Sequence, residues 1–150
     1  MKILMVCLGN ICRSPLAEGI LRDKTRLHNL DWEIDSAGTG MWHTGEAPDP
    51  RSVQVAQKHG IDISDQRART IKPYDLEVFD LIYAMDSSNY RNILALAQSP
   101  EEEAKVQMIM NEKTPGGNQS VPDPYWDDDG FEKVFQMLDQ AAESIVEKHS

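Results

Sequence analysis

The chain has 150 residues, of which 40% are hydrophobic and 27% are charged, and this balance is typical of a soluble globular domain rather than of a disordered or fibrous chain. Its 25 acidic and 15 basic residues leave a net charge of −10, which is the wrong sign for binding nucleic-acid phosphates or anionic membrane surfaces. We therefore expect a single domain over residues 1–150, with neither a nucleic acid nor a membrane among its partners.

Signals for export, cross-linking and metal binding are missing from the sequence. The opening apolar run, residues 3–8, is too short for a secretory signal or a membrane span, so a cytoplasmic protein is expected. Two cysteines, Cys7 and Cys12, are too few and too close together to form a disulfide framework. The four histidines lack the spacing of zinc ligands. We expect neither a structural disulfide nor a metal ion or other cofactor.

The N-terminal segment predicts a strand, a tight loop and a helix. Residues 2–7 are a nearly continuous apolar run, as in a strand that is buried on both faces of a parallel sheet. Gly9-Asn10 ends the run, and a helix is expected over 14–28, with Ser14 as its N-cap and Pro15 at its first position. The apolar positions expected on the buried side of this helix are Leu16, Ile20 and Leu27.

The same alternation continues along the chain. A short strand over 32–36 and a glycine-bearing loop over 37–48 precede a helix over 50–60 that Asp49 caps. Val53 and Ala56 are expected on its buried side. The following expected elements are a strand over 81–85, a helix over 87–97, a strand over 106–110 and a final helix with the apolar stripe Phe131, Val134, Phe135, Leu138, Ala142 and Ile145.

Strands that alternate with helices predict an α/β fold, an open sheet with helices on both faces and right-handed crossovers. In such sheets ligands bind beyond the carboxyl ends of the strands. Residues 111–129 have no periodicity and contain two glycines, three prolines and three consecutive aspartates. A loop of that length in a compact domain is usually functional or mobile.

Chemistry is concentrated between the first strand and the first helix, in residues 7–14, which we call the cup. Five residues separate Cys7 from Arg13, enough for the backbone to curl with its N–H groups inward above the positive end of the helix dipole, and such a loop binds anions. Arg13 adds a planar fork of donors for two phosphate oxygens. A cysteine beside such donors is held as the nucleophilic thiolate, whereas the alternative is that Cys7 is a small buried hydrophobe. The residues of the phosphate-binding cup are Cys7, Leu8, Gly9, Asn10, Ile11, Cys12, Arg13 and Ser14.

The segment CLGNICRSPLAE, which starts at Cys7, resembles the phosphate-binding loop of the low-molecular-weight protein tyrosine phosphatases. The likeness spans essentially the whole chain and continues in Ser36-Ala-Gly-Thr39, Pro48-Asp-Pro-Arg51, Ala84-Met-Asp86 and Asp123-Pro-Tyr125. It implies three layers around four parallel strands and metal-independent hydrolysis of phosphotyrosine through a phosphocysteine on Cys7. Arg13 would stabilise the phosphoryl group and Asp123 would be the general acid and base. The implied partners are phosphotyrosine proteins and phosphate or other oxyanions in the cup, and the implied state is a monomer or a weak homodimer.

Asp123 also has a physical argument for its role. Pro124 biases it towards an extended conformation, from which its carboxyl group can reach over the cup and protonate a leaving phenolate. The alternative is an ordinary turn aspartate among several nearby acidic residues.

Supporting residues follow from the resemblance. It implies a hydrogen bond from Ser14 to the thiolate and one between Asn10 and Ser36, although an N-cap and two turn residues would look the same. Glu18 lies one residue too late for a capping box with Ser14, which leaves that hydroxyl free for another contact. Cys12 matches the second loop cysteine, which could trap oxidised Cys7 as a reversible disulfide, or it simply packs.

The walls of the cleft are expected from aromatic residues. Trp42, Tyr125 and Trp126 match positions that flank the phosphotyrosine ring in the resembled family, and the alternative is that they are exposed loop aromatics. Gln66 stands where eukaryotic members often have histidine, so the hydrogen bonds supporting the cup are expected to differ. Residues 41–46 are expected to tune peptide preference.

Four other functions share parts of this pattern. Arsenate reductases of this fold need further cysteines that the chain lacks, and protein-arginine phosphatases carry threonine where Ile11 stands. A phosphocysteine carrier of sugar transport would have no use for Arg13 or Asp123, and a phosphotyrosine-binding pseudoenzyme would not need both a nucleophile and an acid.

Overall fold

The computed structural model describes all 150 residues and contains one sheet of four parallel strands in the order β2-β1-β3-β4. The strands are β1 (Lys2–Cys7), β2 (Glu33–Gly38), β3 (Leu81–Ala84) and β4 (Val106–Met108). Strand β1 is central: it pairs with β2 from Lys2 opposite Glu33 to Cys7 opposite Gly38, and with β3 on its other side. The strand that ends in the candidate nucleophile is therefore hydrogen-bonded along both edges.

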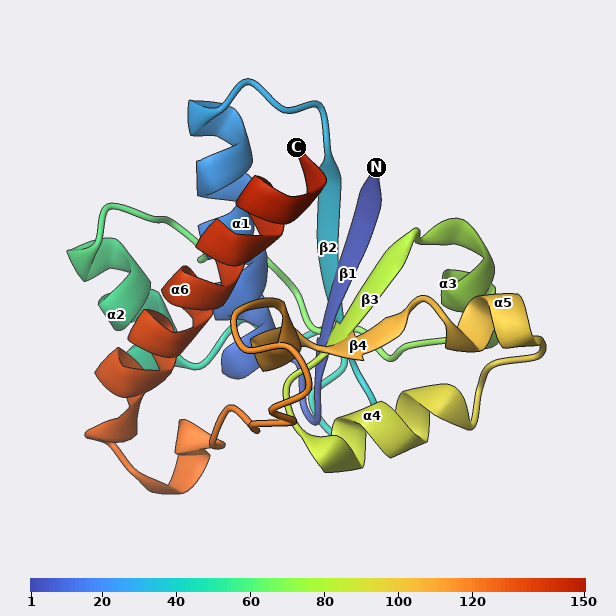
Figure 1. Ribbon diagram of the computed structural model, residues 1–150. Helices are drawn as coiled ribbons and strands as arrows, with labels where there is room; N and C mark the ends of the chain where they lie inside the picture. Colours follow the sequence, from blue (N-terminus) through green and yellow to red (C-terminus); the bar gives the residue numbers. More distant parts are fainter.

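Helices cover both faces of this sheet, which confirms the predicted three layers (Figure 1). The helices are α1 (Arg13–Leu27), α2 (Pro50–Lys58), α3 (Pro73–Val78), α4 (Ser87–Leu94), α5 (Pro100–Glu103) and α6 (Gly130–His149), with short 3₁₀ helices η1 (Ile109–Glu112) and η2 (Pro124–Trp126). In Figure 1, α1, α2 and α6 lie on one side of the strands, and α3, α4 and α5 lie on the other. In this view β1 runs downwards from the N-terminus, and both the loop after it and η2 lie in the lower half of the picture.

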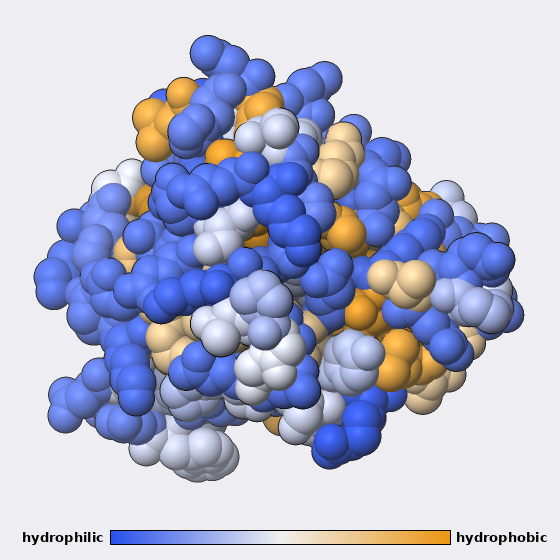
Figure 2. All heavy atoms as spheres, viewed as in Figure 1, coloured by the Kyte–Doolittle hydropathy of each residue, from blue (hydrophilic) through white to orange (hydrophobic).

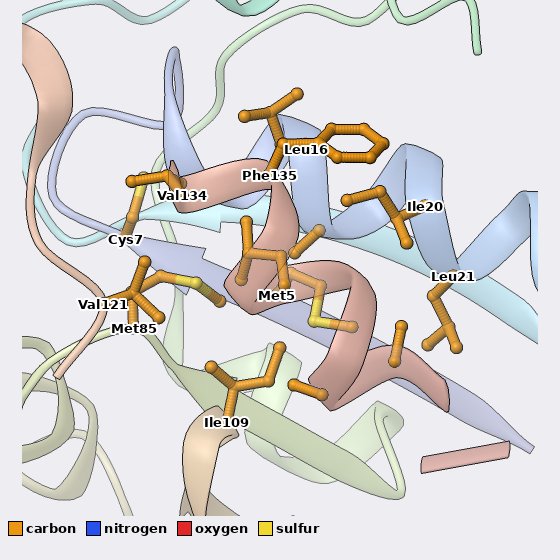
Figure 3. Close-up of a cluster of buried hydrophobic side chains, with 14 of the residues drawn as sticks. Met5, Cys7, Leu16, Ile20, Leu21, Met85, Ile109, Val121, Val134 and Phe135 are labelled. Carbon is orange, nitrogen blue, oxygen red and sulfur yellow. The ribbon is translucent and has the colours of Figure 1, made fainter. Parts of the chain in front are cut away.

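The two faces of the sheet bury two separate apolar clusters. Ile3, Met5 and Cys7 point into the larger cluster, which α1 and α6 complete, whereas Leu4 and Val6 point into the smaller one. Figure 3 shows part of the larger cluster, with Cys7 at one end of the view and Leu21 at the other. Because both faces are covered, β1 is apolar at every position after Lys2 rather than at alternate ones.

The start of α1 differs from the prediction. The helix begins at Arg13 with Cys12 as its N-cap, so Ser14 lies inside the first turn and Pro15 is its third residue rather than its first. Ser14 is fully buried, and its hydroxyl contacts side chains of the cup instead of capping the helix. Leu27 was also expected to be buried, but it is 65% exposed because the last turn of α1 extends beyond the apolar core.

Other boundaries shift by a few residues. β2 runs to Gly38 rather than Ser36, since it pairs along the full length of β1, and α4 ends at Leu94 rather than at residue 97. The predicted strand over 106–110 ends at Met108 and continues as η1. In α2 the buried valine is Val55, whereas Val53 is only half-buried. The short helix α3 was not predicted, because six residues carry too little periodicity.

The surface view in Figure 2 is mostly hydrophilic, with apolar residues visible as small separate patches. None of the helices is both long enough and apolar enough to cross a membrane.

Candidate active site

The cup lies at the carboxyl end of β1 and is held there by backbone contacts with the end of β2. The N–H group of Thr39 donates to the carbonyl of Cys7 at 2.9 Å, and that of Gly40 donates to Leu8 at 2.8 Å. A Cβ atom on Gly38 would lie 2.8 Å from the carbonyl oxygen of Leu8, so this close approach requires glycine. No N–H group of residues 8–12 donates to another backbone carbonyl, which leaves these donors for an anion.

Asn10 organises the inside of the cup. Its φ of 58° lies in the left-handed region that asparagine tolerates. Its side-chain oxygen accepts from the N–H group of Arg69 at 3.0 Å, and its amide nitrogen donates to Ser14 Oγ at 2.8 Å and to Ser36 Oγ at 3.0 Å. Ser14 Oγ in turn lies 3.0 Å from Cys7 Sγ. The structure thus brings Cys7, Asn10, Ser14 and Ser36 into one buried hydrogen-bonded chain.

Glu18 extends this chain through Ser36, a contact that the sequence did not predict. Ser36 Oγ donates to Glu18 Oε1 at 2.6 Å, and Arg22 pairs with the other carboxylate oxygen at 3.1 Å. Glu18 is only 3% exposed, and burial raises its pKa against the opposing effects of Ser36 and Arg22. The available signal was its position four residues after Ser14, which places both side chains on one face of α1.

Gln66 takes no part in the chain, as its departure from the family pattern suggested. Its amide nitrogen donates to the carbonyl of Pro15 at 3.1 Å, and its side-chain oxygen is buried without a partner. The outer end of the chain is therefore a carboxylate on α1, not a side chain at position 66.

Arg13 is buried at the base of the cup between two acidic residues. One guanidinium nitrogen donates to Asp86 at 2.7 Å and to the carbonyl of Val121 at 3.0 Å, and the other lies 3.7 Å from Asp123. Burial disfavours its charge, but the negative charges of Cys7, Asp86 and Asp123 outweigh that and raise the pKa of Arg13. In the sequence, Asp86 stands out only as part of the motif Ala84-Met-Asp86; its place between the carboxyl end of β3 and the start of α4 was the signal for its role.

Asp123 stands at the mouth of the cup, in the segment that lacked periodicity. The N–H group of Val121 donates to the carbonyl of Met85 at 2.8 Å, which ties this segment to the end of β3. Asp123 then caps η2: its Oδ1 accepts from the N–H group of Tyr125 at 3.1 Å. The opposite carboxylate oxygen faces Arg13, so the predicted nucleophile, arginine and acid surround one space.

A cleft of about 300 Å³ opens above the cup. Trp42, Tyr125 and Trp126 line it, as expected, and Tyr125 meets Trp126 edge to face with ring centroids 4.9 Å apart. Trp42 and Trp126 are 70% and 87% exposed, so they form the rim rather than a closed wall. His43, in the segment 41–46 that was expected to tune peptide preference, also lines the cleft, and its Nδ1 atom lies 3.1 Å from a Glu46 carboxylate oxygen.

Cys12 differs chemically from Cys7. It is 4% exposed, and burial, followed by the charge of Asp49, raises its pKa to about 12. Cys12 is therefore a neutral thiol at neutral pH, and both cysteines are free. No group of three or more His, Cys, Asp or Glu side chains is placed to hold a metal ion.

The chain is similar over nearly its whole length to known proteins. The family model described as low molecular weight phosphotyrosine protein phosphatase matches residues 2–149. The protein of that name from Schizosaccharomyces pombe is 43% identical over 141 residues, which cover 91% of this chain and 89% of the relative. A protein tyrosine phosphatase of Entamoeba histolytica, crystallised with Hepes in its active site, is 36% identical with a TM-score of 0.92, covering 99% of this chain and 96% of that one. The Drosophila arginine phosphatase is 32% identical with a TM-score of 0.93, covering 100% and 98%.

Proposed function

The chain belongs to the low molecular weight phosphotyrosine protein phosphatase family, and on that basis we propose that residues 1–150 act as one domain that hydrolyses phosphotyrosine in proteins, without a metal ion, through a phosphocysteine on Cys7. The observation that carries the proposal is the convergence of three groups on one cleft: Cys7 with a hydroxyl 3.0 Å from its sulfur, buried Arg13, and Asp123 above them.

In the first step, the sulfur of Cys7 attacks phosphorus in line with the bond to the tyrosine oxygen. A bond from sulfur to phosphorus forms, the bond from phosphorus to oxygen breaks, and Asp123 gives its proton to the leaving phenolate. The free N–H groups of residues 8–12 and the Arg13 guanidinium bind the equatorial oxygens on which charge spreads. Asp86 holds Arg13 in place for that contact.

In the second step, water attacks the phosphocysteine. Asp123, now a carboxylate, takes the proton from water; a new oxygen–phosphorus bond forms, and the sulfur leaves as a thiolate. The Ser14 hydroxyl, oriented because Asn10 already donates to its oxygen, donates its own hydrogen to that sulfur and stabilises it as nucleophile and as leaving group. Inorganic phosphate then occupies the cup as product.

The lining of the cleft supports an aromatic substrate. Ile11 is apolar and 8% exposed at the edge of the cup, and three aromatic side chains line the space above it. The aromatic walls can stack against a phenyl ring, and the Ile11 side chain offers no hydrogen-bond acceptor to the N–H groups of a phosphoarginine guanidinium. This favours phosphotyrosine over phosphoarginine, despite the similarity to the Drosophila enzyme.

We also propose that the protein is cytoplasmic and is a monomer or a weak homodimer.

The test is hydrolysis of p-nitrophenyl phosphate and of a phosphotyrosine peptide in EDTA, with orthovanadate as inhibitor. We expect wild-type protein to turn over both substrates, and vanadate to block the reaction. Cys7→Ser should lose turnover but still bind phosphate, because the N–H donors and Arg13 remain. Turnover by Cys7→Ser would contradict the nucleophile. A stable phosphocysteine in the wild type would favour the phosphocysteine carrier, and no reaction at all would favour the phosphotyrosine-binding pseudoenzyme.

A further inference from the structure

The motif Pro48-Asp-Pro-Arg51 has no part in the mechanism above, yet it connects the two halves of the site. Asp49 caps α2 and its N–H group donates to the carbonyl of Ile11 in the cup at 2.8 Å. Its carboxylate accepts from the Arg51 guanidinium at 2.9 and 3.0 Å. The start of α2 is thereby fastened to the cup, and Arg51 projects from this anchored turn.

Arg51 reaches from there to residues 123–129, which we call the acid loop. Its guanidinium carbon lies 5.5 Å from the ring centroid of Tyr125 and 4.6 Å from that of Phe131, at the start of α6. The same guanidinium forms an ion pair with Asp128. Arg51 therefore contacts the acid loop near its start, where the guanidinium lies over the Tyr125 ring, and near its end, where it pairs with Asp128.

These contacts bear on the proton donor itself. The N–H group of Tyr125 donates to Asp123, so the backbone of Tyr125 sets the orientation of that carboxyl group. Asp123 has a 37% exposed side chain, and within the acid loop this N–H group is its hydrogen-bond partner. A shift of Tyr125 would move Asp123 relative to the cup, and a misplacement of about 1 Å can cost about 100-fold in rate.

We propose that Arg51 is a positioning residue that holds the acid loop over the cup, so that Asp123 can protonate the leaving group. This inference rests on the proposed phosphatase function. Arg51 touches neither the phosphoryl group nor the sulfur; it acts through Tyr125 and Asp128. An arginine suits this position because its flat guanidinium packs against aromatic rings while its edge binds two carboxylates, which lysine cannot do.

The experiment compares two substrates of similar size, p-nitrophenyl phosphate, whose leaving group needs little protonation, and phenyl phosphate, whose leaving group needs much. We expect Arg51→Met to lower kcat/KM for phenyl phosphate by up to about 100-fold and for p-nitrophenyl phosphate far less. Arg51→Lys should recover part of the loss because it keeps a charge between Asp49 and Asp128. The matched control is Arg26→Met, which removes an exposed arginine paired with Asp23 on α1 and should leave both rates unchanged.

A double-mutant cycle separates this role from a general effect on folding. In an Asp123→Ala background, Arg51→Met should cost less than about twofold on either substrate, since the group that it positions is gone. The rate of Cys7 alkylation by iodoacetate should be unchanged in Arg51→Met. If Arg51→Met does not fold, Asp128→Asn, at an 83% exposed position, should show the same leaving-group preference more weakly.

Equal losses on both substrates, or full losses in the Asp123→Ala background, would overturn the role of Arg51 and leave the phosphatase function intact. Failure of the proposed function would look different. In that case Asp123→Ala itself would show no dependence on the leaving group, or wild-type protein would hydrolyse neither substrate, and the inference would fall with it.

Discussion

The directions of the hydrogen bonds inside the cup follow from a single residue. Because the side-chain oxygen of Asn10 is occupied by the N–H group of Arg69, its amide can only donate to Ser14 and Ser36. Each serine then uses its own hydrogen in the other direction, Ser14 towards the sulfur of Cys7 and Ser36 towards Glu18. A charge-assisted hydrogen bond at each end therefore follows from one orientation of one amide group.

At the residue scale, the role of Asp123 predicts a dependence on the leaving group. Asp123→Ala should lower kcat/KM on a phosphotyrosine peptide by about 100- to 10,000-fold, the usual contribution of a general acid. The loss on p-nitrophenyl phosphate should be much smaller, because p-nitrophenolate leaves without a proton. Steady-state kinetics on both substrates measure the difference, and equal losses would remove Asp123 from the acid role.

Glu18 gives a second prediction at this scale, in the pH dependence of stability. Burial raises its pKa in the folded state above the usual 4.5, so the folded protein binds this proton more tightly than the unfolded chain does. The contribution of Glu18 to stability is therefore complete below the unfolded pKa and is lost as pH rises through the folded pKa. Against Glu18→Gln, which does not titrate, wild-type protein should become relatively less stable as the pH rises above the usual pKa of 4.5.

Urea unfolding of both proteins across that range measures the effect. The Gln variant serves as the reference because every other titrating group is common to both proteins. A difference in unfolding free energy that stays flat, or that rises with pH, would mean that the folded protein does not raise the pKa of Glu18.

At the scale of elements, the geometry of the cup depends on the pairing of two strands. Cys7 lies opposite Gly38 in the register of β1 and β2. Beyond that pair, the N–H groups of Thr39 and Gly40 donate to the carbonyls of Cys7 and Leu8. The loop after β1 can bend back over β2 only where no side chain stands in the way. Gly38 supplies that gap, and the ladder sets its position opposite the nucleophile.

Gly38→Ala should therefore distort the cup. Its Cβ atom would lie 2.8 Å from a backbone oxygen and 3.1 Å from the backbone nitrogen of Asn10, and neither is the end of a flexible side chain. We expect a loss of about 1–3 kcal/mol in unfolding free energy and weaker binding of phosphate or vanadate. Urea unfolding and inhibition constants measure the two effects.

The matched control is Gly60→Asn, just after α2. Gly60 has a φ of +80°, and no atom lies within 4 Å of an added Cβ, so asparagine should cost little there. Unchanged phosphate binding by Gly38→Ala would show that the close approach does not shape the cup.

At the scale of the whole molecule, a net charge of −10 opposes a dianionic substrate. Charges farther away than the Debye length of about 8 Å are largely screened at physiological salt, so the donors of the cup and Arg13 dominate binding. Where long-range electrostatic attraction speeds substrate binding, it does so by at least about tenfold, and salt removes that gain. We therefore expect kcat/KM for p-nitrophenyl phosphate to change by less than about tenfold between low and physiological salt. A steep loss of activity with salt would contradict this local account.

The sequence by itself determined the type of each main element and the residues that we propose as the reactive groups. Continuous apolar runs, helical stripes and breakers act over neighbouring residues, so β1 and α6 could be predicted from local pattern. The spacing from Cys7 to Arg13 is likewise local, because a strand, a short loop and a helix start place the two residues at one cup. Asp123 could be chosen over the other nearby aspartates only through its resemblance to a family motif, with Pro124 as a physical reason for its role.

Only the tertiary structure decided which distant residues support these groups. Ser36 meets Glu18, Asp86 meets Arg13, and Arg51 meets Tyr125 because parallel strands bring their carboxyl ends to one edge of the sheet and helices pack beside them. Nothing in the local pattern of Ser14 distinguishes a helix cap from a donor to sulfur, since both need a serine at a helix start. Long-range packing decides between the two roles, because it buries the Ser14 hydroxyl beside the sulfur of Cys7 instead of leaving it to cap α1.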